Sequence, residues 1–478
     1  MSADFIAVTP MLIVMLSACA VLLAEAFRRP GEDVPHGLLG GIGLVGAIAA
    51  SVFLWKRDVI GFGVIVIDHY SLFFYITLCA IGLLTILLSS GTARRDRLPM
   101  GEYYALMLFS IVGMMMMAST RDLLIIFIAL EIMSIGVYVL TGIKRTSAAG
   151  AEGAFKYFVL GAFSSAFFLY GIAFAYAVAG TTKLDEIGMR VASTSTSPSV
   201  LVILAMVLLL VGFAFKISAV PFHMWTPDAY EGAPTLVTGF MSTAVKAAAF
   251  AAFLRVFLSA FEPLHVQWAP VLSAIAALTM LLGTIVGVAQ TNVKRMLAYS
   301  SIAHGGYLLV GLIAASGAGK ASILFDLVAY GITNLGAFGV LAALSTQDRP
   351  HEEVRDFAGL SQERPGLAAI LTVFLLSLGG FPPTVGFVAK WYIFSAAVQK
   401  GMLALAILGV LTSVISVFFY LRIVVMMYMT ESRETAHRPP TSRLAMAGML
   451  IALAVVFYLG VMPGQLIALA ADSVASIF

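Results

Sequence analysis

The sequence predicts an all-α polytopic membrane protein with about 14 transmembrane helices. Of its 478 residues, 61% are apolar and only 11% are charged, and the mean hydropathy is +1.00. Soluble proteins usually have about a quarter of their residues charged, because a compact body needs a polar surface. The composition therefore excludes a soluble enzyme, a nucleic-acid-binding protein and a disordered chain, and it predicts a lipid bilayer as the surroundings.

Apolar runs of about 20 residues, the length that crosses a bilayer, recur along the whole chain. Fourteen such runs lie at residues 5–27, 37–55, 70–90, 102–119, 121–142, 151–179, 199–230, 234–258, 269–290, 296–316, 321–345, 365–399, 402–430 and 442–463. The first run has no basic residues before it, so we expect a retained helix and not a signal peptide. The predicted divisions are 1–100 (helices 1–3), 101–260 and 265–430 (five helices each) and 440–478 (helix 14).

Basic residues predict the orientation, because positively charged connections stay in the cytoplasm. The connections after odd-numbered helices carry fifteen: Arg28, Arg29, Arg94, Arg95, Arg97, Lys144, Arg145, Lys294, Arg295, Arg349, Arg355, Arg364, Arg433, Arg438 and Arg443. The other connections carry seven: Lys56, Arg57, Arg121, Lys183, Arg190, Lys320 and Lys400. We therefore expect both termini on the non-cytoplasmic side of a bacterial plasma (inner) membrane.

Two of the runs are too long for one straight crossing, and proline interrupts each near its middle. Run 199–230 contains Pro221, and run 365–399 contains Pro382 and Pro383. Proline removes a backbone donor, and lipid tolerates the freed carbonyls only where they face protein or water. The broken helices are numbers 7 and 12, five apart, so equivalent helices cross in opposite directions. The pattern predicts two inverted five-helix repeats, helices 4–8 and 9–13, as in many transporters.

Ionisable side chains inside the apolar runs are the candidates for function, because each costs about 2.5–3.5 kcal/mol near the middle of the bilayer. One acid, three lysines and a histidine at similar depth predict a proton relay: Glu131, Lys216, Lys246, His304 and Lys390. Lys156 is a weaker candidate, because it can pair with Glu152 one turn earlier. His223 is also weaker, because it can cap the carbonyls that Pro221 frees.

The hypothesis is that Glu131 pairs with Lys216 and sets its proton affinity, while the other candidates pass charge laterally through water. Burial disfavours the charged form of a lysine and a nearby carboxylate favours it, so moving the partner can switch the proton on or off. Arg255 and Arg422 lie nearer to helix ends, and we expect them to extend to the membrane surface.

The sequence predicts no metal site and no cofactor in this chain. Zinc patterns, CxxC pairs and the P-loop pattern are missing from the sequence. No connection is long enough to fold into a domain that binds flavin, nucleotide or an iron–sulfur cluster. A sodium site made of backbone and hydroxyl oxygens would leave no readable motif, so sodium stays open.

These residues carry a resemblance to a known family. The chain resembles the antiporter-like proton-conducting subunits of respiratory complex I, which are similar to Mrp-type cation/proton antiporter subunits. The resemblance covers nearly the whole chain and rests on Glu131, Lys216 and Lys246, and on the segments VPFHMW (220–225), PDAYEGAPT (227–235) and GFPPTVGF (380–387) with Lys390. It is greatest to the subunit N family, since subunit M typically has an acid in place of Lys390.

The resemblance implies redox-driven proton pumping by an NADH:quinone oxidoreductase. It implies that Glu131 and Lys216 form the switching pair, that Lys246 is central and that Lys390 ends the path, and it matches Lys156 to a family lysine. NADH, FMN, iron–sulfur clusters and quinone would belong to partner subunits, and the partners would include the other antiporter-like subunits. Two alternatives remain: an Mrp-type sodium/proton antiporter that needs no NADH, and a non-conducting scaffold, against which the many buried charges argue.

Overall fold

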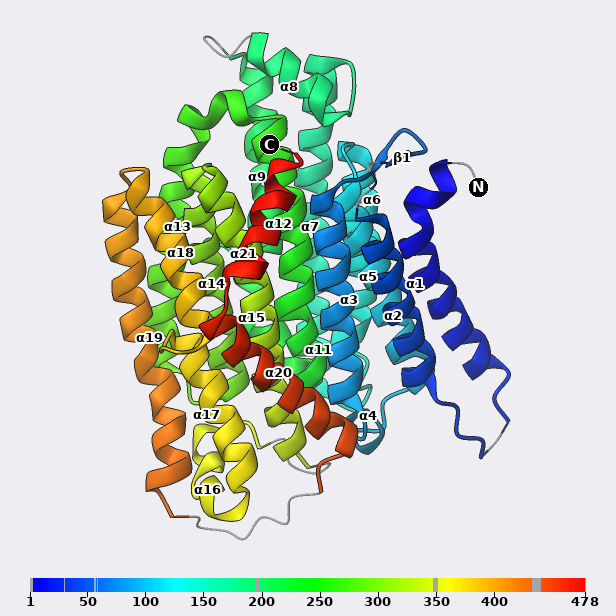
Figure 1. Ribbon diagram of the computed structural model, residues 1–478, viewed down its shortest axis with the longest axis vertical. Coiled ribbons are helices and arrows are strands. Elements are labelled where there is room, and N and C mark those ends of the chain that lie inside the picture. Colours follow the sequence, from blue (N-terminus) through cyan, green and yellow to red (C-terminus); the bar gives the residue numbers. More distant parts are fainter. Residues whose placement is uncertain are drawn as a thin grey trace.

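The computed structural model describes residues 3–29, 31–55, 57, 59–193, 198–346, 351–431 and 440–477. The chain is almost entirely helical, and its long helices stand side by side in one bundle (Figure 1). Within these ranges, twelve helices are long and apolar enough to cross a membrane. The predicted polytopic helical fold is therefore confirmed.

The N-terminal part contains three long helices and one small hairpin. Its elements are α1 (Ala3–Ala26), α2 (His36–Leu54), β1 (Val59–Gly61), β2 (Ile65–Ile67), α3 (His69–Ser89) and the short α4 (Thr92–Arg95). The two strands pair antiparallel, with Val59 opposite Ile67. Asp68 caps α3, since its carboxylate accepts from the Ser71 amide at 2.8 Å and so satisfies a donor at the helix start.

The middle of the chain contains the first broken helix. Its elements are α5 (Met100–Ser119), α6 (Leu123–Thr141), α7 (Ala148–Ala179), α8 (Leu184–Ser193), α9 (Val200–Lys216), α10 (Trp225–Gly232), and the continuous α11 (Thr235–Phe240), η1 (Met241–Val245) and α12 (Lys246–Ser259). The α11–α12 helix is buried along its length, so it forms the centre of the bundle.

The C-terminal part contains the second broken helix. Its elements are η2 (Glu262–Leu264), α13 (His265–Ala289), α14 (Val293–Ala314), α15 (Gly317–Leu344), η3 (Val354–Phe357), α16 (Leu360–Glu363), α17 (Pro365–Gly379), α18 (Val385–Gln399), α19 (Leu403–Met429), α20 (Arg443–Val461) and α21 (Gly464–Ala475). Sequence reasoning missed α21, because its 12 residues are too few for a crossing. This helix packs against α15 and α3.

The backbone of the two breaks has matching features. A residue with positive φ ends each preceding helix, Ser218 (63°) in the first break and Gly380 (87°) in the second. The next amide then bonds back to the helix: Ala219 N to Ala214 O at 2.8 Å, and Phe381 N to Leu376 O at 3.0 Å. Each of these residues in the second break follows its counterpart in the first break by 162 residues (218 to 380, 219 to 381).

A second set of matching contacts lies before α6 and α14. Leu123 N donates to Thr182 O at 2.9 Å, and Val293 N donates to Glu352 O at 2.7 Å. These residues are 170 apart in both cases (123 to 293, 182 to 352). Glycines at the same offset, Gly113 and Gly283, let the preceding helix approach α6 or α14, since a Cβ there would lie within 2.9 Å of backbone atoms.

The beginning of α1 and the end of α21 lie at the same end of the bundle, together with the hairpin and α8 (Figure 1). The short α4 and α16 lie at the opposite end. Four residues that we used to predict the orientation lie outside the described ranges: Lys56, Arg349, Arg433 and Arg438.

Candidate functional site

Three buried lysines in separate helices share one kind of environment. Lys216, Lys246 and Lys390 are 3%, 2% and 9% exposed. Each ammonium donates to one serine hydroxyl, namely Ser134 at 2.7 Å, Ser301 at 2.6 Å and Ser413 at 2.8 Å. Each also lies near the face of a tyrosine ring: Tyr138 at 5.3 Å and Tyr157 at 5.7 Å for Lys216, Tyr330 at 5.6 Å for Lys246, and Tyr307 at 5.6 Å for Lys390. Such rings attract cations, and a serine hydroxyl both donates and accepts, so these neighbours can hold and transmit a proton.

Lys216 is the last residue of α9 and points at α6. Its ammonium donates to Ser134 Oγ at 2.7 Å and to Tyr138 OH at 3.3 Å. Glu131 lies one turn before Ser134 on α6, and its carboxylate accepts from Ser165 Oγ of α7 at 2.5 Å. The hypothesised pair of Glu131 and Lys216 is not among the ion pairs of the described residues, and Ser134 Oγ lies beside the ammonium.

Aromatic rings close the first break around Lys216. The Trp225 indole donates from Nε1 to the Phe215 carbonyl at 3.1 Å, and the same carbonyl accepts from the Ser218 amide at 3.1 Å. The Tyr157 and Trp225 rings are stacked with centroids 4.0 Å apart and planes at 3°. Lys216 Nζ lies 5.7 Å from the Tyr157 ring centre. The lysine is therefore held in an aromatic pocket with hydroxyl groups on one side.

Lys246 begins α12, directly after the π-helical turn η1, and reaches α14. Its ammonium donates to both the hydroxyl and the carbonyl of Ser301. A Cβ placed on Gly305 would lie 3.0 Å from the Ile217 carbonyl and 3.8 Å from Lys246 Nζ. The missing side chain of Gly305 thus lets the residue after Lys216 approach the surroundings of Lys246.

His304 and Asp326 form an ion pair next to Lys246, with His304 Nε2 2.7 Å from Asp326 Oδ2. Asp326 is 1% exposed. Tyr330 lies one turn further along α15, and its ring stacks on the imidazole with centroids 4.0 Å apart. Asp326 was not among the candidates predicted from the sequence. Asp326 and Tyr330 are four residues apart, which places them on one face of a helix. This spacing was the signal that could have found the pair of Asp326 and His304, on which Tyr330 stacks.

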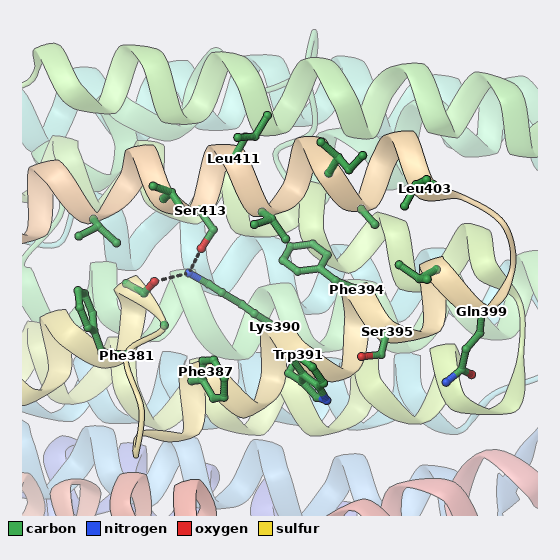
Figure 2. A pocket seen from close by; sticks show the side chains of 18 residues that line it. Phe381, Phe387, Lys390, Trp391, Phe394, Ser395, Gln399, Leu403, Leu411 and Ser413 are labelled. Atoms are coloured by element: carbon green, nitrogen blue, oxygen red, sulfur yellow. Dashed lines mark hydrogen bonds between the residues drawn. The ribbon is translucent and has the colours of Figure 1, made fainter.

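Lys390 lies on α18 and holds the end of α17 together. Its ammonium donates to the Leu378 carbonyl at 2.8 Å and the Gly379 carbonyl at 3.1 Å, which the break of the helix leaves free. Ser413 of α19 is the third acceptor (Figure 2). An apolar cavity of about 1000 Å³ extends from Lys390 between α18 and α19, with Phe387 and Trp391 among its lining residues.

A much smaller cavity lies between His304 and Lys390. Its volume is about 10 Å³, close to the space that the centre of one water molecule needs. Its other polar lining residues are Ser300, Tyr307, Tyr330, Ser416 and Tyr420. One water molecule there would connect the imidazole with the ammonium.

The two weaker candidates have different surroundings. The Lys156 ammonium pairs with Glu152 at 2.7 Å, as its spacing indicated, and with Asp228 at 2.8 Å. Asp228 also contacts Arg295 at 2.8 Å, so these side chains form a charged network that joins α7, α10 and α14. His223 is half-buried within the first break.

The expectation for Arg255 was wrong. Its side chain is 0% exposed and does not reach the membrane surface. The guanidinium makes two hydrogen bonds to the Asp68 carboxylate, at 3.1 and 3.2 Å, and two to the Ala118 carbonyl, at 3.1 and 2.9 Å. The reason is that the cap of α3 places a buried carboxylate against α12, which draws the arginine inwards. In the part of the chain that the structure describes, no group of three histidine, cysteine or acidic side chains could hold a metal ion.

The bundle with two broken helices and three buried lysines is that of an antiporter-like membrane subunit, and comparisons with known proteins agree. Residues 120–416 match the family described as "NADH:quinone oxidoreductase/Mrp antiporter, TM". NADH-quinone oxidoreductase subunit N of Trichlorobacter lovleyi is 45% identical over 89% of this chain and 88% of its own length. Subunit N 2 of Rhizobium meliloti is 41% identical over 98% and 97%. The chain belongs to the NADH-quinone oxidoreductase subunit N family, which confirms the resemblance.

Solved structures show the same fold. A chain of respiratory complex I from Thermus thermophilus with bound aureothin matches with a TM-score of 0.82 and 35% identity, covering 97% of this chain and 99% of that one. A chain of the Mrp complex from Dietzia sp. matches with a TM-score of 0.85 over 100% and 98%, but at 21% identity, so it shows the fold alone.

Proposed function

We propose that this protein conducts protons through the relay Glu131, Lys216, Lys246, His304 and Lys390, as the membrane subunit N of an NADH:quinone oxidoreductase. The observation that carries the proposal is the shared setting of Lys216, Lys246 and Lys390, which are all buried and each contact one serine hydroxyl and at least one tyrosine ring. An ammonium held by neutral hydroxyl groups can give up its proton without leaving a buried carboxylate unpaired. An inert scaffold has no use for three such costly charges.

The proposed path runs from one lysine to the next through residues packed between them. Glu131 and Ser134 share one face of α6, so a charge on the carboxylate acts on the Lys216 ammonium that Ser134 binds. The packing at Gly305 brings the end of α9 to Lys246. From Lys246, the path continues past Ser301 to His304 one turn later. The small cavity then leads from His304 to Lys390.

The proposal includes fourteen crossings with two inverted repeats. Twelve long helices and the pairs α9–α10 and α17–α18 add up to this number. The contacts that recur at offsets of 170 and 162 residues support equivalent units at 101–260 and 265–430. Residues 1–100 then form the N-terminal helices, and residues 440–478 form the C-terminal part.

Both chain ends are proposed to face away from the cytoplasm of a bacterial inner membrane. The start of α1 and the end of α21 lie at one end of the bundle, while α4 with Arg94 and Arg95 lies at the other (Figure 1). Basic residues favour the cytoplasmic side. Lys156 and His223 belong to the proposed relay as lateral members, since the Asp228–Arg295 network links Lys156 to α14.

The protein works as one subunit of a larger enzyme. Its partners are other membrane subunits of the complex, including the other antiporter-like ones, and the surrounding lipid. We propose that it carries no redox centre, so NADH, FMN, iron–sulfur clusters and quinone are handled by partner subunits. Electron transfer must then be coupled to Glu131 and Lys216 by changes in neighbouring chains.

Replacement of Lys216 by alanine tests the proposal. In membrane vesicles that contain the whole complex, NADH-driven proton uptake and NADH:quinone electron transfer are measured together, and a native gel checks assembly. We expect both activities to fall about a hundredfold, the smaller of the effects that positioned proton-transfer groups have. Lys183→Ala is the control, because this lysine is 58% exposed and pairs with Glu186 at the surface.

An assembled Lys216→Ala complex that pumps at the level of the unaltered protein would contradict the proposed path. Exchange of sodium for protons without NADH, at unchanged rate in the variant, would instead favour the Mrp-type alternative.

A further inference from the structure

The two halves of the bundle differ in where their acidic side chain lies. In the first half, Glu131 lies on α6, one turn before the serine that binds Lys216. The position equivalent to Glu131, 170 residues later, is Ser301 on α14, which binds Lys246. The position equivalent to Ser134 is His304. The second half therefore lacks an acid at the place where the first half has one.

Asp326 supplies a carboxylate to the second half from another helix. It lies on α15 and is 1% exposed. Two other aspartates in the described ranges, Asp68 and Asp122, are buried, but both cap helix starts. Asp326 lies ten residues into its helix, so it is an acid buried in a spanning segment, which is costly without a positive neighbour.

The positive charges around Asp326 come from three elements. His304 of α14 contacts it directly at 2.7 Å. Lys246 of α12 is bound to Ser301, one turn before His304. Lys390 of α18 shares the small cavity with His304. The histidine is charged only when it is protonated. The Asp326 carboxylate is therefore a negative charge that Lys246 and Lys390 share, with the imidazole of His304 between.

We propose that Asp326 is a positioning residue of the relay, which orients His304 and stabilises its protonated form while a proton passes from Lys246 to Lys390. This inference rests on the proposed function. A carboxylate only accepts hydrogen bonds, so Nε2 of His304 carries the proton and Nδ1 is left to take another one. The same division of roles operates where an aspartate orients a catalytic histidine.

The proton transfers balance in two steps. The Lys246 ammonium releases one proton, which His304 takes on Nδ1, and Asp326 then faces an imidazolium. The imidazolium returns one proton to the cavity water as that water gives one to a neutral Lys390 amine. At the end His304 is neutral again, Lys390 has gained one proton and Lys246 has lost one.

Asp326→Asn tests this role, because asparagine keeps the size and an acceptor oxygen but removes the charge. In membrane vesicles with the whole complex, we expect normal assembly and a fall of about tenfold in NADH-driven proton uptake. This is less than the 10²–10⁴ of a proton-transfer group, since His304 stays hydrogen-bonded. Asp326→Glu, which restores the charge, is expected to recover most of the activity. Asn334→Ala on the same helix is the control, because it removes a buried hydrogen bond to Ser242 outside the relay.

A double variant separates positioning from general damage. If Asp326 acts through His304, Asp326→Asn combined with His304→Gln pumps no worse than His304→Gln alone. Full pumping by Asp326→Asn, or independent losses that multiply in the double variant, would overturn the proposal. If Asp326→Asn does not assemble, His304→Gln decides, since full pumping by this variant also overturns it.

Lys246→Ala distinguishes the two levels of the argument. If Lys246→Ala loses pumping while Asp326→Asn retains it fully, only the role of Asp326 is wrong. If both variants assemble and pump fully, the proposed proton relay itself is wrong.

Discussion

The buried pair of Arg255 and Asp68 predicts an unequal cost for removing its two members. The pair joins α12 to the start of α3, and the guanidinium is fully buried. Arg255→Met leaves the carboxylate with two further partners, the Ser71 amide at 2.8 Å and Arg121 at 3.7 Å. Asp68→Asn leaves the guanidinium with a neutral amide and the Ala118 carbonyl. The remaining charge is therefore better satisfied in the first variant.

The magnitudes follow from this difference. Breaking a buried ion pair on one side costs about 3–5 kcal/mol in free energy of unfolding. We expect Arg255→Met near the lower value and Asp68→Asn near the upper one. Asparagine still caps a helix, so loss of the cap adds little in the second variant. The double variant contains no unpaired charge. We therefore expect its loss of free energy of unfolding to be smaller, by about 2–3 kcal/mol, than the sum of the losses of the two single variants.

The assay is thermal inactivation of the assembled complex in detergent, with the fraction of intact complex read from native gels. The expected order of midpoints is unaltered protein, Arg255→Met, then Asp68→Asn, with the double variant above Asp68→Asn. Additive shifts in the double variant, or a lower midpoint for Arg255→Met than for Asp68→Asn, would refute the reasoning.

Two further predictions concern packing and pH. Gly283→Ala would place a Cβ 2.6 Å from the Ala303 amide nitrogen, so α13 and α14 must separate. We expect this to cost about 1–3 kcal/mol in free energy of unfolding. Gly366→Ala is the matched control in the same thermal assay, because its Cβ meets no atom within 4 Å. Burial alone would raise the pKa of Asp68, but Arg255 and Ser71 lower it below its usual 3.8. The stabilisation that Asp68 contributes is thus complete above pH 3.8, its usual pKa. It is lost as the pH falls through the lower pKa of Asp68 in the folded protein. Thermal midpoints measured against pH should lose this dependence in Arg255→Met.

Much of the fold could be predicted because a membrane imposes simple rules on a sequence. Spans follow from runs of apolar residues, and the breaks follow from Pro221, Pro382 and Pro383 in runs too long for one helix. The same rule missed α21, whose 12 residues do not span a bilayer and which is held by packing on α15 and α3. Length and hydropathy therefore identify the helices that span the membrane, but not the shorter helices that packing against the rest of the protein holds in place.

The candidate site was predictable in its charges but not in their partners. Lys216, Lys246 and Lys390 are conspicuous because few ionisable groups occur in apolar runs. Their partners are serine hydroxyls and backbone carbonyls, which are ordinary in any membrane helix. Arg255 shows the same limit, since its acid lies 187 residues away in the chain and in another helix. A charge in a membrane helix shows that a compensating group exists, and only the packing shows which group it is.

The same limit applies to Glu131 and Asp326. The sequence could place both acids in apolar runs but could not identify the side chains that contact them. The folded chain places a serine hydroxyl beside each of the ammonium groups of Lys216, Lys246 and Lys390, while Glu131 accepts from Ser165 and Asp326 contacts His304. An acid that does not pair directly with an ammonium can influence its proton without holding it permanently. For the proposed relay this arrangement is more useful than a closed ion pair, because a closed pair would have to be broken at every transfer.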